Sequence, residues 1–274
     1  FYELDRLSPA EVHHLNRLDA LFVPSEWARS VAQSSGVYYP TIVVAEPGVD
    51  PTLFHPGVQP MPVRTPGIDP TIFVNVGKWE VRKGHDVLAE AFARAFSPDD
   101  DAVLIMHNAN PFLSPAQQAE WAALYDSALG GRVYVTNGRL PRQQDVASLM
   151  ASAHCGVFPA RAEGWNLEAL EMMAMGKTVI VTDGTSHRQF CDESNALLVP
   201  LGPPEPAFDG VFFDGTRGEW PSFTEDSMEA LVAHLRDVHR RRKEGDPLRN
   251  EGGLATARRL TWDRTARTIL EALA

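Results

Sequence analysis

Apolar and polar positions follow two rhythms along this chain, and the two rhythms alternate. From Pro70 onward, short β-rich apolar runs are separated by segments in which apolar residues recur at helical spacing. The predicted strands cover 71–76, 102–106, 132–135, 155–158 and 178–181, and the predicted helices cover 85–96, 114–129, 143–153 and 167–175. Strands separated by helices of this size form right-handed crossovers. The pattern therefore predicts an α/β fold with a doubly wound, Rossmann-like parallel sheet.

The two ends of the chain differ from this middle part. Two shorter α/β repeats precede it, with helices predicted at 9–18 and 25–34 and strands at 20–23 and 41–45. About fifty residues are too few for an independent doubly wound domain, so we expect a remnant of a second α/β domain. After the middle part, 225–242 and 254–273 are predicted as amphipathic helices, the second broken near Leu260, and 200–221 as a loop with at most a short hairpin.

These patterns divide the chain into four predicted parts. They are an N-terminal remnant (1–46), a proline-dense linker (47–70), the Rossmann-like domain (71–250) and a C-terminal helical segment (251–274).

Composition narrows the classes of protein. With 274 residues, of which 44% are apolar and 22% charged, the chain is neither disordered nor a small disulfide-stapled module. A net charge of −11 repels phosphate backbones and argues against nucleic-acid binding. No apolar run reaches the roughly 18 residues that span a bilayer. Cys155 and Cys191 have neither metal nor redox spacing, and Cys155 is predicted to be a small buried residue in a strand.

Residues whose side chains could bind a ligand or take part in a reaction lie in loops that directly follow predicted strands. Open α/β sheets bind their ligands at these loops. The first loop runs from Gly77 to Gly84 and contains Lys78, Arg82 and Lys83. Its glycines allow a sharp turn, and its cations could hold a diphosphate as point charges. The same residues also fit an ordinary loop with exposed basic side chains.

The second loop follows the strand at 155–158 and leads into the next helix. Asn166 suits the N-cap and Glu168 the first helical turn, where free N–H groups attract an anion. Glu163 and Glu171 carry carboxylates, which repel phosphate but accept hydrogen bonds from vicinal hydroxyls. This favours a ligand with phosphates in its middle and sugar-like diols on either side. The alternative is a helix with ordinary acidic surface positions.

A third loop, 182–187, ends in His187. A lone histidine beside a turn is more often structural than catalytic. Because these three loops contain neither an Asp-x-Asp ligand pair nor a histidine cluster, no metal site is predicted.

With these residues in view, the chain resembles a known family. The spacing of Glu163 and Glu171, followed by the run from Met172 to Ile180, is similar to the Glu-x7-Glu signature of retaining glycosyltransferases with the GT-B fold. That family includes sucrose synthases and phosphatidylinositol mannosyltransferases. Further motifs in family order are Phe22-Val23-Pro24-Ser25-Glu26-Trp27, Gly48-Val49-Asp50 with Phe54-His55-Pro56, Gly77 to Gly84, and Leu260-Thr261-Trp262-Asp263. The resemblance spans nearly the whole chain.

The resemblance implies a role for each matching residue. Lys78, where members usually have Arg, and Lys83 would contact the donor diphosphate. Glu163 would accept hydroxyls of the transferred sugar, and Glu171 would hold the ribose diol. The other implied donor contacts are Gly77, the backbone of Gly164, Trp165, Asn166 and Leu167, and Arg139 and Leu140 in the loop 137–140, where the nucleobase is read.

The sequence also departs from the family pattern. Asn166 and Glu168 replace the commoner Gly and Pro, as in one bacterial-type subgroup, and Lys78 in place of Arg loses bidentate phosphate geometry. The family's N-terminal domain, with its acceptor pocket, would lie before Phe1. The chain therefore resembles the C-terminal, donor-binding half of a GT-B enzyme.

The implied function is hexosyl transfer from a nucleoside diphosphate sugar, of UDP or GDP type, to a carbohydrate or lipid acceptor with retention of configuration and without a metal or other cofactor. The implied partners are the donor, that acceptor, and the missing N-terminal domain or a partner chain that supplies it. The expected location is the cytoplasm, with peripheral membrane attachment through that domain left open. The alternatives are a binding module without turnover and a GT-B relative with other chemistry, such as a phosphorylase or an epimerase.

Overall fold

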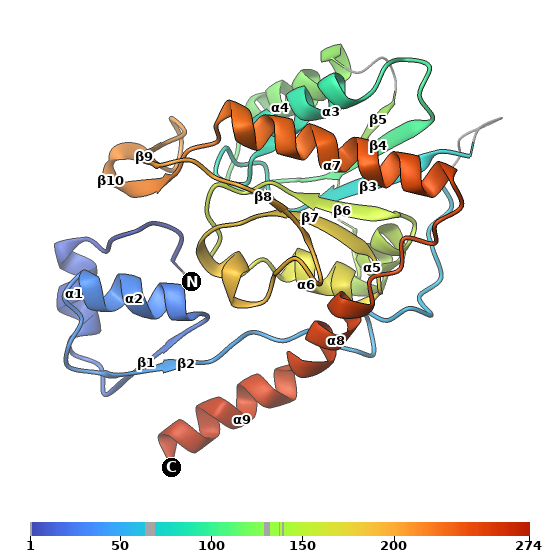
Figure 1. Cartoon of the computed structure of the whole chain (residues 1–274). Coiled ribbons are helices and arrows are strands. Elements are labelled where there is room, and N and C mark those ends of the chain that lie inside the picture. The colour runs from blue at the N-terminus through green and yellow to red at the C-terminus, as the bar shows by residue number, and fades with distance from the viewer. Residues whose placement is uncertain (1, 64–68, 129–131, 137, 139) are drawn as a thin grey trace.

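A six-stranded parallel sheet forms the centre of the protein. The computed structural model describes residues 2–63, 69–128, 132–136, 138 and 140–274. In spatial order, the strands are β5 (Val133–Val135), β4 (Ala102–His107), β3 (Thr71–Val76), β6 (Cys155–Phe158), β7 (Thr178–Thr182) and β8 (Leu197–Val199). All neighbouring pairs run parallel, which confirms the predicted fold class (Figure 1).

Side chains alternate between the two faces of this sheet and build two separate hydrophobic cores. Along β3, Phe73 packs into one core and Val74 into the other; along β7, Ile180 and Val181 divide in the same way. The first face is covered by α3 (His85–Ala95), α4 (Pro115–Ala128) and α7 (Glu225–Lys243), and the second by α5 (Gln143–Ala151), α6 (Leu167–Ala174) and α8 (Glu251–Arg259). Burial on both faces explains why the strands form continuous apolar runs in the sequence.

The order of the strands fixes where a ligand can bind. β3 and β6 lie side by side at the centre, and the chain continues from β3 toward β4 on one side and from β6 toward β7 on the other. Such a reversal opens a crevice at the carboxyl ends of the two strands. The loops 77–84 and 159–166 both begin there.

A small α/β unit precedes the linker. It consists of α1 (Pro9–Leu15), β1 (Ala20–Val23), α2 (Glu26–Ser34) and β2 (Thr41–Val44), and its two strands pair in parallel. The N-cap residue of α2, Ser25, is buried and shares a hydrogen bond of 2.8 Å with Ser186. Ser186 belongs to the short 3₁₀ helix η1 (Thr185–Gln189), so this unit is joined to the sheet domain close to the β7 loop.

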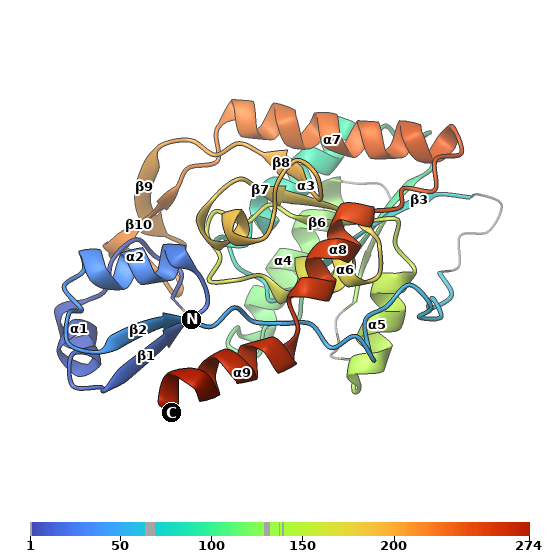
Figure 2. The ribbon, with the colours of Figure 1, turned by 60° about the horizontal axis from the view of Figure 1, so that its bottom comes forward.

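The linker and the C-terminal helices cross each other. In the described residues 47–63 and 69–70, the linker has neither a helix nor an extended strand, but Val49 forms an isolated parallel bridge with Thr261. A Cβ atom on Gly48 would lie 2.0 Å from the carbonyl carbon of Thr261, so this crossing requires glycine. Thr261 also caps α9 (Trp262–Leu273), which confirms the predicted break in the last helix. α9 then runs back toward the N-terminal unit (Figure 2).

Two details differ from the sequence prediction. The segment predicted as a loop with at most a short hairpin forms an antiparallel hairpin of β9 (Pro204–Phe208) and β10 (Asp214–Pro221). Its prolines are tolerated because a two-stranded ribbon leaves an edge of each strand unpaired. β8 was not predicted, since a strand of three residues is too short to show periodicity.

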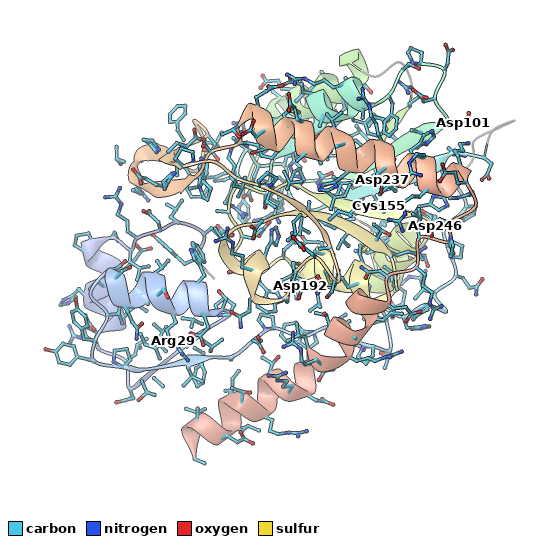
Figure 3. The ribbon with its side chains drawn as sticks, in the orientation of Figure 1. Arg29, Asp101, Cys155, Asp192, Asp237 and Asp246 are labelled. Atoms are coloured by element: carbon cyan, nitrogen blue, oxygen red, sulfur yellow. The ribbon has the colours of Figure 1, made fainter. Side chains whose placement is uncertain are left out.

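The predicted burial of Cys155 is confirmed: its side chain lies within β6 between the two helix layers, and burial raises the pKa of its thiol (Figure 3). None of the helices in the described ranges combines the length and the apolar character that crossing a membrane requires.

Candidate functional site

The loops after β3 and β6 are held tightly together. The backbone N–H of Arg161 donates to the carbonyl of Arg82 at 2.7 Å, and the guanidinium of Arg82 donates to the carbonyl of Ala162, also at 2.7 Å. Gly84 has a φ of +73°, and a Cβ atom there would lie 2.0 Å from the carbonyl oxygen of Pro159. Only glycine fits here, because the backbones of the two predicted loops approach each other closely at this point. The two loops therefore form one site.

An ionic cluster joins these loops. Lys83 Nζ lies 2.8 Å from Glu163 Oε1, and Arg82 Nη1 lies 3.3 Å from Glu163 Oε2. The Glu163 and Arg82 side chains are almost fully buried, and Lys83 is 12% exposed. Burial alone would raise the pKa of Glu163, but the charges of Lys83 and Arg82 outweigh it and lower that pKa to about 2. Glu163 is therefore ionised throughout the physiological range.

The N-terminus of α6 lies beside this cluster. Lys83 Nζ is 3.8 Å from Glu168, which stands in the first turn of the helix. The N-cap Asn166 adopts a φ of +82° and accepts a hydrogen bond from the backbone N–H of Ala169 at 3.0 Å. Lysine and free helical N–H groups together form an environment suited to an anion.

His187 supports this cap. Its Nδ1 donates to the carbonyl of Thr182 at 2.9 Å, because a carbonyl can only accept, and its Nε2 therefore accepts from Asn166 Nδ2 at 2.9 Å. Burial lowers the pKa of His187, which matches this neutral form. Its partners give His187 the structural role that the sequence favoured.

Glu171 lies on the next turn of α6 in a different environment. Burial, together with the charge of Glu168, raises the pKa of Glu171 to about 8. No ion pair of its carboxylate occurs within the described part of the chain. A half-buried carboxyl without a cation is suited to neutral hydroxyl partners rather than to a charged one.

A cavity of about 350 Å³ adjoins Glu168 at the carboxyl ends of the strands. Gly77 and Leu140 line it, together with His107 from the end of β4 and Arg142, the residue before α5. The structure thus brings two of the predicted donor contacts, Gly77 and Leu140, to one hollow. Arg139 and Asn137 lie outside the described residues.

The remaining predicted residues, Lys78 and the run 164–167, lie in different surroundings. Lys78 is 45% exposed, pairs with Glu80 at 3.3 Å and lies 5.3 Å from the centre of the Phe112 ring. Within the described part of the chain, Lys78 contacts neither Lys83 nor Glu163. The Trp165 side chain is buried against Phe190. Because this side chain is buried, the backbone is the part of Trp165 that is left for contact with a ligand.

Two carboxylates of the cluster were missing from the predicted site. Glu80 binds the Arg82 guanidinium at 2.7 Å, and Glu3, from the N-terminal segment, reaches it at 3.1 Å. The sequence identified Arg82 only as a positive charge in the loop. Its burial could not be foreseen because Glu3 is 79 positions away in the chain.

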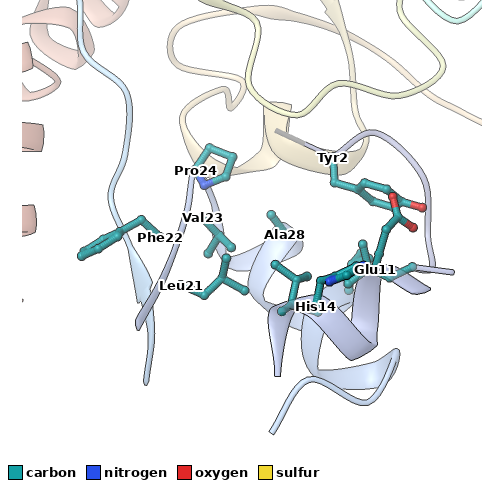
Figure 4. A pocket seen from close by; sticks show the side chains of 12 residues that line it. Tyr2, Glu11, His14, Leu21, Phe22, Val23, Pro24 and Ala28 are labelled. Atoms are coloured by element: carbon teal, nitrogen blue, oxygen red, sulfur yellow. The ribbon is translucent and has the colours of Figure 1, made fainter. Parts of the chain in front are cut away.

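Another cavity, of about 340 Å³, lies in the N-terminal unit. Leu21, Val23 and Ala28 line it, with Glu11 and His14 beside them, as Figure 4 shows. Its lining contains no lysine or arginine, so it lacks the charges that hold a phosphate. Within the described residues, no three His, Cys, Asp or Glu side chains come together in a way that could hold a metal ion.

Comparison with known proteins decides the family. The model of the glycosyl transferases group 1 family matches residues 70–211, which is more than half of the chain. The chain belongs to this family. Over 163 residues it is 32% identical to D-inositol 3-phosphate glycosyltransferase from Arthrobacter sp. (strain FB24), and the match covers 58% of this chain and 38% of that protein.

Solved structures support the same fold for this member of the group 1 family. Sucrose-phosphate synthase from Thermosynechococcus elongatus superposes with a TM-score of 0.70 at 21% identity, over 96% of this chain and 59% of that one. Anabaena Alr3699/HepE, solved in complex with UDP-glucose, gives a TM-score of 0.70 at 15% identity, over 96% and 66% of the two chains. These likenesses confirm the predicted GT-B type of α/β fold. The chain spans only part of the length of each of these proteins.

Proposed function

We propose that this chain forms the donor-binding side of a retaining hexosyltransferase, which moves a sugar from a nucleoside diphosphate sugar to a carbohydrate or lipid acceptor. The main supporting observation is the position of Lys83, 2.8 Å from Glu163 and 3.8 Å from Glu168 at the start of α6. One cation and one helix N-terminus are thus flanked by carboxylates, Glu163 in the loop and Glu171 further along the helix. This is the charge order that a diphosphate between two diols requires.

Each donor group then has a partner. Lys83, Lys78 and the N–H groups at Asn166 and Leu167 bind the diphosphate, and Glu163 accepts hydroxyl hydrogens of the hexose. Glu171 binds the ribose diol. The wall around Gly77 and Leu140 holds the nucleoside, and the loop containing Arg139 contacts the base.

The chemistry in this proposal is electrostatic. As the bond between the hexose and the diphosphate breaks, negative charge grows on the leaving diphosphate. Lys83 and the helix N-terminus stabilise that charge without having to reorganise, because Glu163 already fixes Lys83. The proposed reaction therefore needs no metal. The proposed location of the reaction is the cytoplasm.

The acceptor side is completed from outside the sheet domain. Residues 1–46 supply part of it, and a further N-terminal domain or a partner chain supplies the rest. The family relative acts on an inositol phosphate by its name, and Alr3699/HepE was solved with UDP-glucose. The complex with UDP-glucose supports a sugar-nucleotide donor for this chain.

Calorimetric titration with UDP, GDP and ADP, each against its own nucleoside, tests the donor site. We expect saturable binding of one diphosphate, weakened at least about tenfold when the phosphates are removed, since charge-assisted hydrogen bonds contribute about 1.5–3 kcal/mol each. Equal binding of nucleoside and diphosphate, or no binding of any of the six compounds, would contradict the proposal. Retention is tested by proton NMR of the anomeric centre in the transferred sugar.

A further inference from the structure

Arg82 is the most heavily engaged charged side chain of the site, although the family resemblance assigned no role to it. Its side chain is 2% exposed and faces three carboxylates: Glu80 at 2.7 Å, Glu3 at 3.1 Å and Glu163 at 3.3 Å. Burying a guanidinium is unfavourable unless such partners surround it. A lone surface loop residue would not be held in this way.

Arg82 and Lys83 grip different oxygens of the same carboxylate. Lys83 Nζ contacts Oε1 of Glu163, whereas Arg82 Nη1 contacts Oε2. Two cations on two oxygens fix the rotation of the carboxylate plane. Lone pairs on both oxygens remain available for hydroxyl donors, since a carboxylate offers about four acceptor positions.

Arg82 is itself held in place by Glu80. Its Nε and Nη2 donate to the same oxygen of Glu80, at 3.0 and 2.7 Å. The other oxygen of Glu80 lies 3.3 Å from Lys78. A chain of alternating charges therefore runs from Lys78 through Glu80, Arg82 and Glu163 to Lys83.

We propose that Arg82 is a positioning residue, which orients the Glu163 carboxylate and keeps it ionised for the hexose of the donor. The assignment of the hexose rests on the proposed function, whereas the effect on Glu163 does not. Through Glu3, the N-terminal segment contacts this same guanidinium, so the acceptor-side part of the chain touches the donor site at Arg82.

The effect of Arg82 on the Glu163 pKa can be distinguished from the effects of the other charged groups around this carboxylate. Lys83 faces it from the same loop as Arg82, His187 from η1 is neutral, and Glu3 and Glu168 add negative charge from two other elements. Without Arg82, Lys83 is the cation among the described residues that still pairs with this carboxylate. Because an opposite charge at this distance lowers a carboxyl pKa by about 1–3 units, its removal raises the pKa of Glu163 by about 1–2 units.

Arg161 provides a matched control. Its side chain is 10% exposed and pairs with Asp86 at 2.8 Å, and it also donates to the carbonyl of Val81 at 2.6 Å. It lies in the same pair of loops, but among the described residues its side chain does not pair with Glu163. Arg161→Met therefore removes another buried and paired arginine of these loops and leaves the ion pairs of Glu163 in place.

The first measurement needs no ligand. Carbon-13 NMR titration of the glutamate carboxyls, with Glu163 assigned through Glu163→Gln, follows the Glu163 pKa in the whole chain. We expect Arg82→Met to bring its titration upward by about 1–2 units, Arg82→Lys by less, and Arg161→Met not at all. Should Arg82→Met not fold, Arg82→Lys decides the question, since its ammonium lacks the planar fork through which two different nitrogens of Arg82 reach Glu80 and Glu163. An unchanged Glu163 pKa in the folded Arg82 variants would overturn the proposal.

The second measurement compares UDP-glucose with UDP, and GDP-mannose with GDP, by calorimetry. The parent chain should bind the sugar nucleotide more tightly than the diphosphate, because the hexose adds contacts. In Arg82→Met we expect this gain in affinity to fall about tenfold while the affinity for the diphosphate changes little. In Arg161→Met we expect the gain to be unchanged. Retention of the full gain in Arg82→Met would overturn the role toward the hexose. If the parent chain bound none of the four compounds, the proposed function would fail, whereas the NMR result would still decide what Arg82 does to Glu163.

Discussion

Glu163 and Glu171 are the same residue type, stand eight positions apart and border the same helix N-terminus, yet their surroundings differ in sign. Two cations hold Glu163 within 3.3 Å and lower its pKa to about 2. Glu171 faces burial and the charge of Glu168, and its pKa rises to about 8. One carboxyl is fixed as an anion, and the other holds its proton at neutral pH.

One sequence motif can therefore hold two kinds of acceptor. A carboxylate that is already paired contributes to the stability of the fold and offers a fixed acceptor, while an unpaired one opposes folding at high pH. In the proposed donor site, the fixed carboxylate faces the reacting sugar, where geometry matters most, and the protonated one faces the ribose. The predictions below test whether the two residues differ in this way.

The largest expected effect is on stability in Glu163→Gln. The change leaves Lys83 and Arg82 without their shared anion, and a shift of the Glu163 pKa from 4.5 to about 2 corresponds to about 3 kcal/mol. Because the folded-state pKa is the lower one, this stabilisation is present above pH 4.5 and is lost as the pH falls toward 2. Urea unfolding of parent and variant should therefore differ by about 3 kcal/mol at pH 7 and by much less near pH 2–3.

Glu168→Gln is the control for this change. Glu168 also faces Lys83, but at 3.8 Å and with 24% of its side chain exposed, so its pair contributes at most about 0.5–1 kcal/mol. Equal destabilisation by the two substitutions would mean that Glu163 has no special place in the cluster.

The next effect concerns the cation between the two carboxylates. Lys83→Ala removes the proposed diphosphate contact, so UDP or GDP should bind at least about tenfold more weakly. Uridine or guanosine should bind almost as before, because neither has a phosphate for Lys83 to contact. Calorimetry on the four compounds checks this. An equal loss for nucleoside and diphosphate would show that Lys83 acts only through the fold.

Glu171→Gln should act on stability with the opposite sign to Glu163→Gln. The folded-state pKa of about 8 lies above the unfolded value, so Glu171 destabilises the fold increasingly as the pH rises from 4.5 to 8. The variant should be more stable than the parent by about 1–2 kcal/mol at pH 9, a value reduced for partial exposure, and equal to it near pH 4. A destabilised variant at pH 9 would contradict the comparison.

Much of this architecture could be predicted from the sequence, because the sheet is buried on both faces. Continuous apolar runs such as Thr71–Val76 and helical spacing around Leu88 and Phe92 are local signals, and they place the loops at the ends of strands. β8 and the extent of the β9–β10 hairpin escaped prediction because three-residue strands and proline-containing ribbons have no clear periodicity.

The candidate site was predictable in its residue types but not in its pairings. The positions of Lys83 and Glu163 follow from loops that end parallel strands. That Arg82 is buried beneath them depends on Glu3, which the chain brings in from the far N-terminal segment. The opposite pKa values of Glu163 and Glu171 depend on burial and on neighbouring charges, which spacing alone does not encode.

The smallest expected effect tests the cause of the raised Glu171 pKa. Since burial is its larger cause and Glu168 the smaller, Glu168→Gln should lower this pKa without returning it to its ordinary value. If ribose hydroxyls bind the ionised form, nucleotide binding at pH 7 releases the Glu171 proton. The Glu168→Gln variant should release fewer protons on binding, because more of its Glu171 is already ionised. Calorimetry of UDP or GDP binding in buffers of different ionisation enthalpy measures this release, with Glu171→Gln subtracting the protons of all other groups. Equal release by the parent and Glu171→Gln would mean that Glu171 does not ionise on binding, and that hydroxyls meet a neutral carboxyl instead.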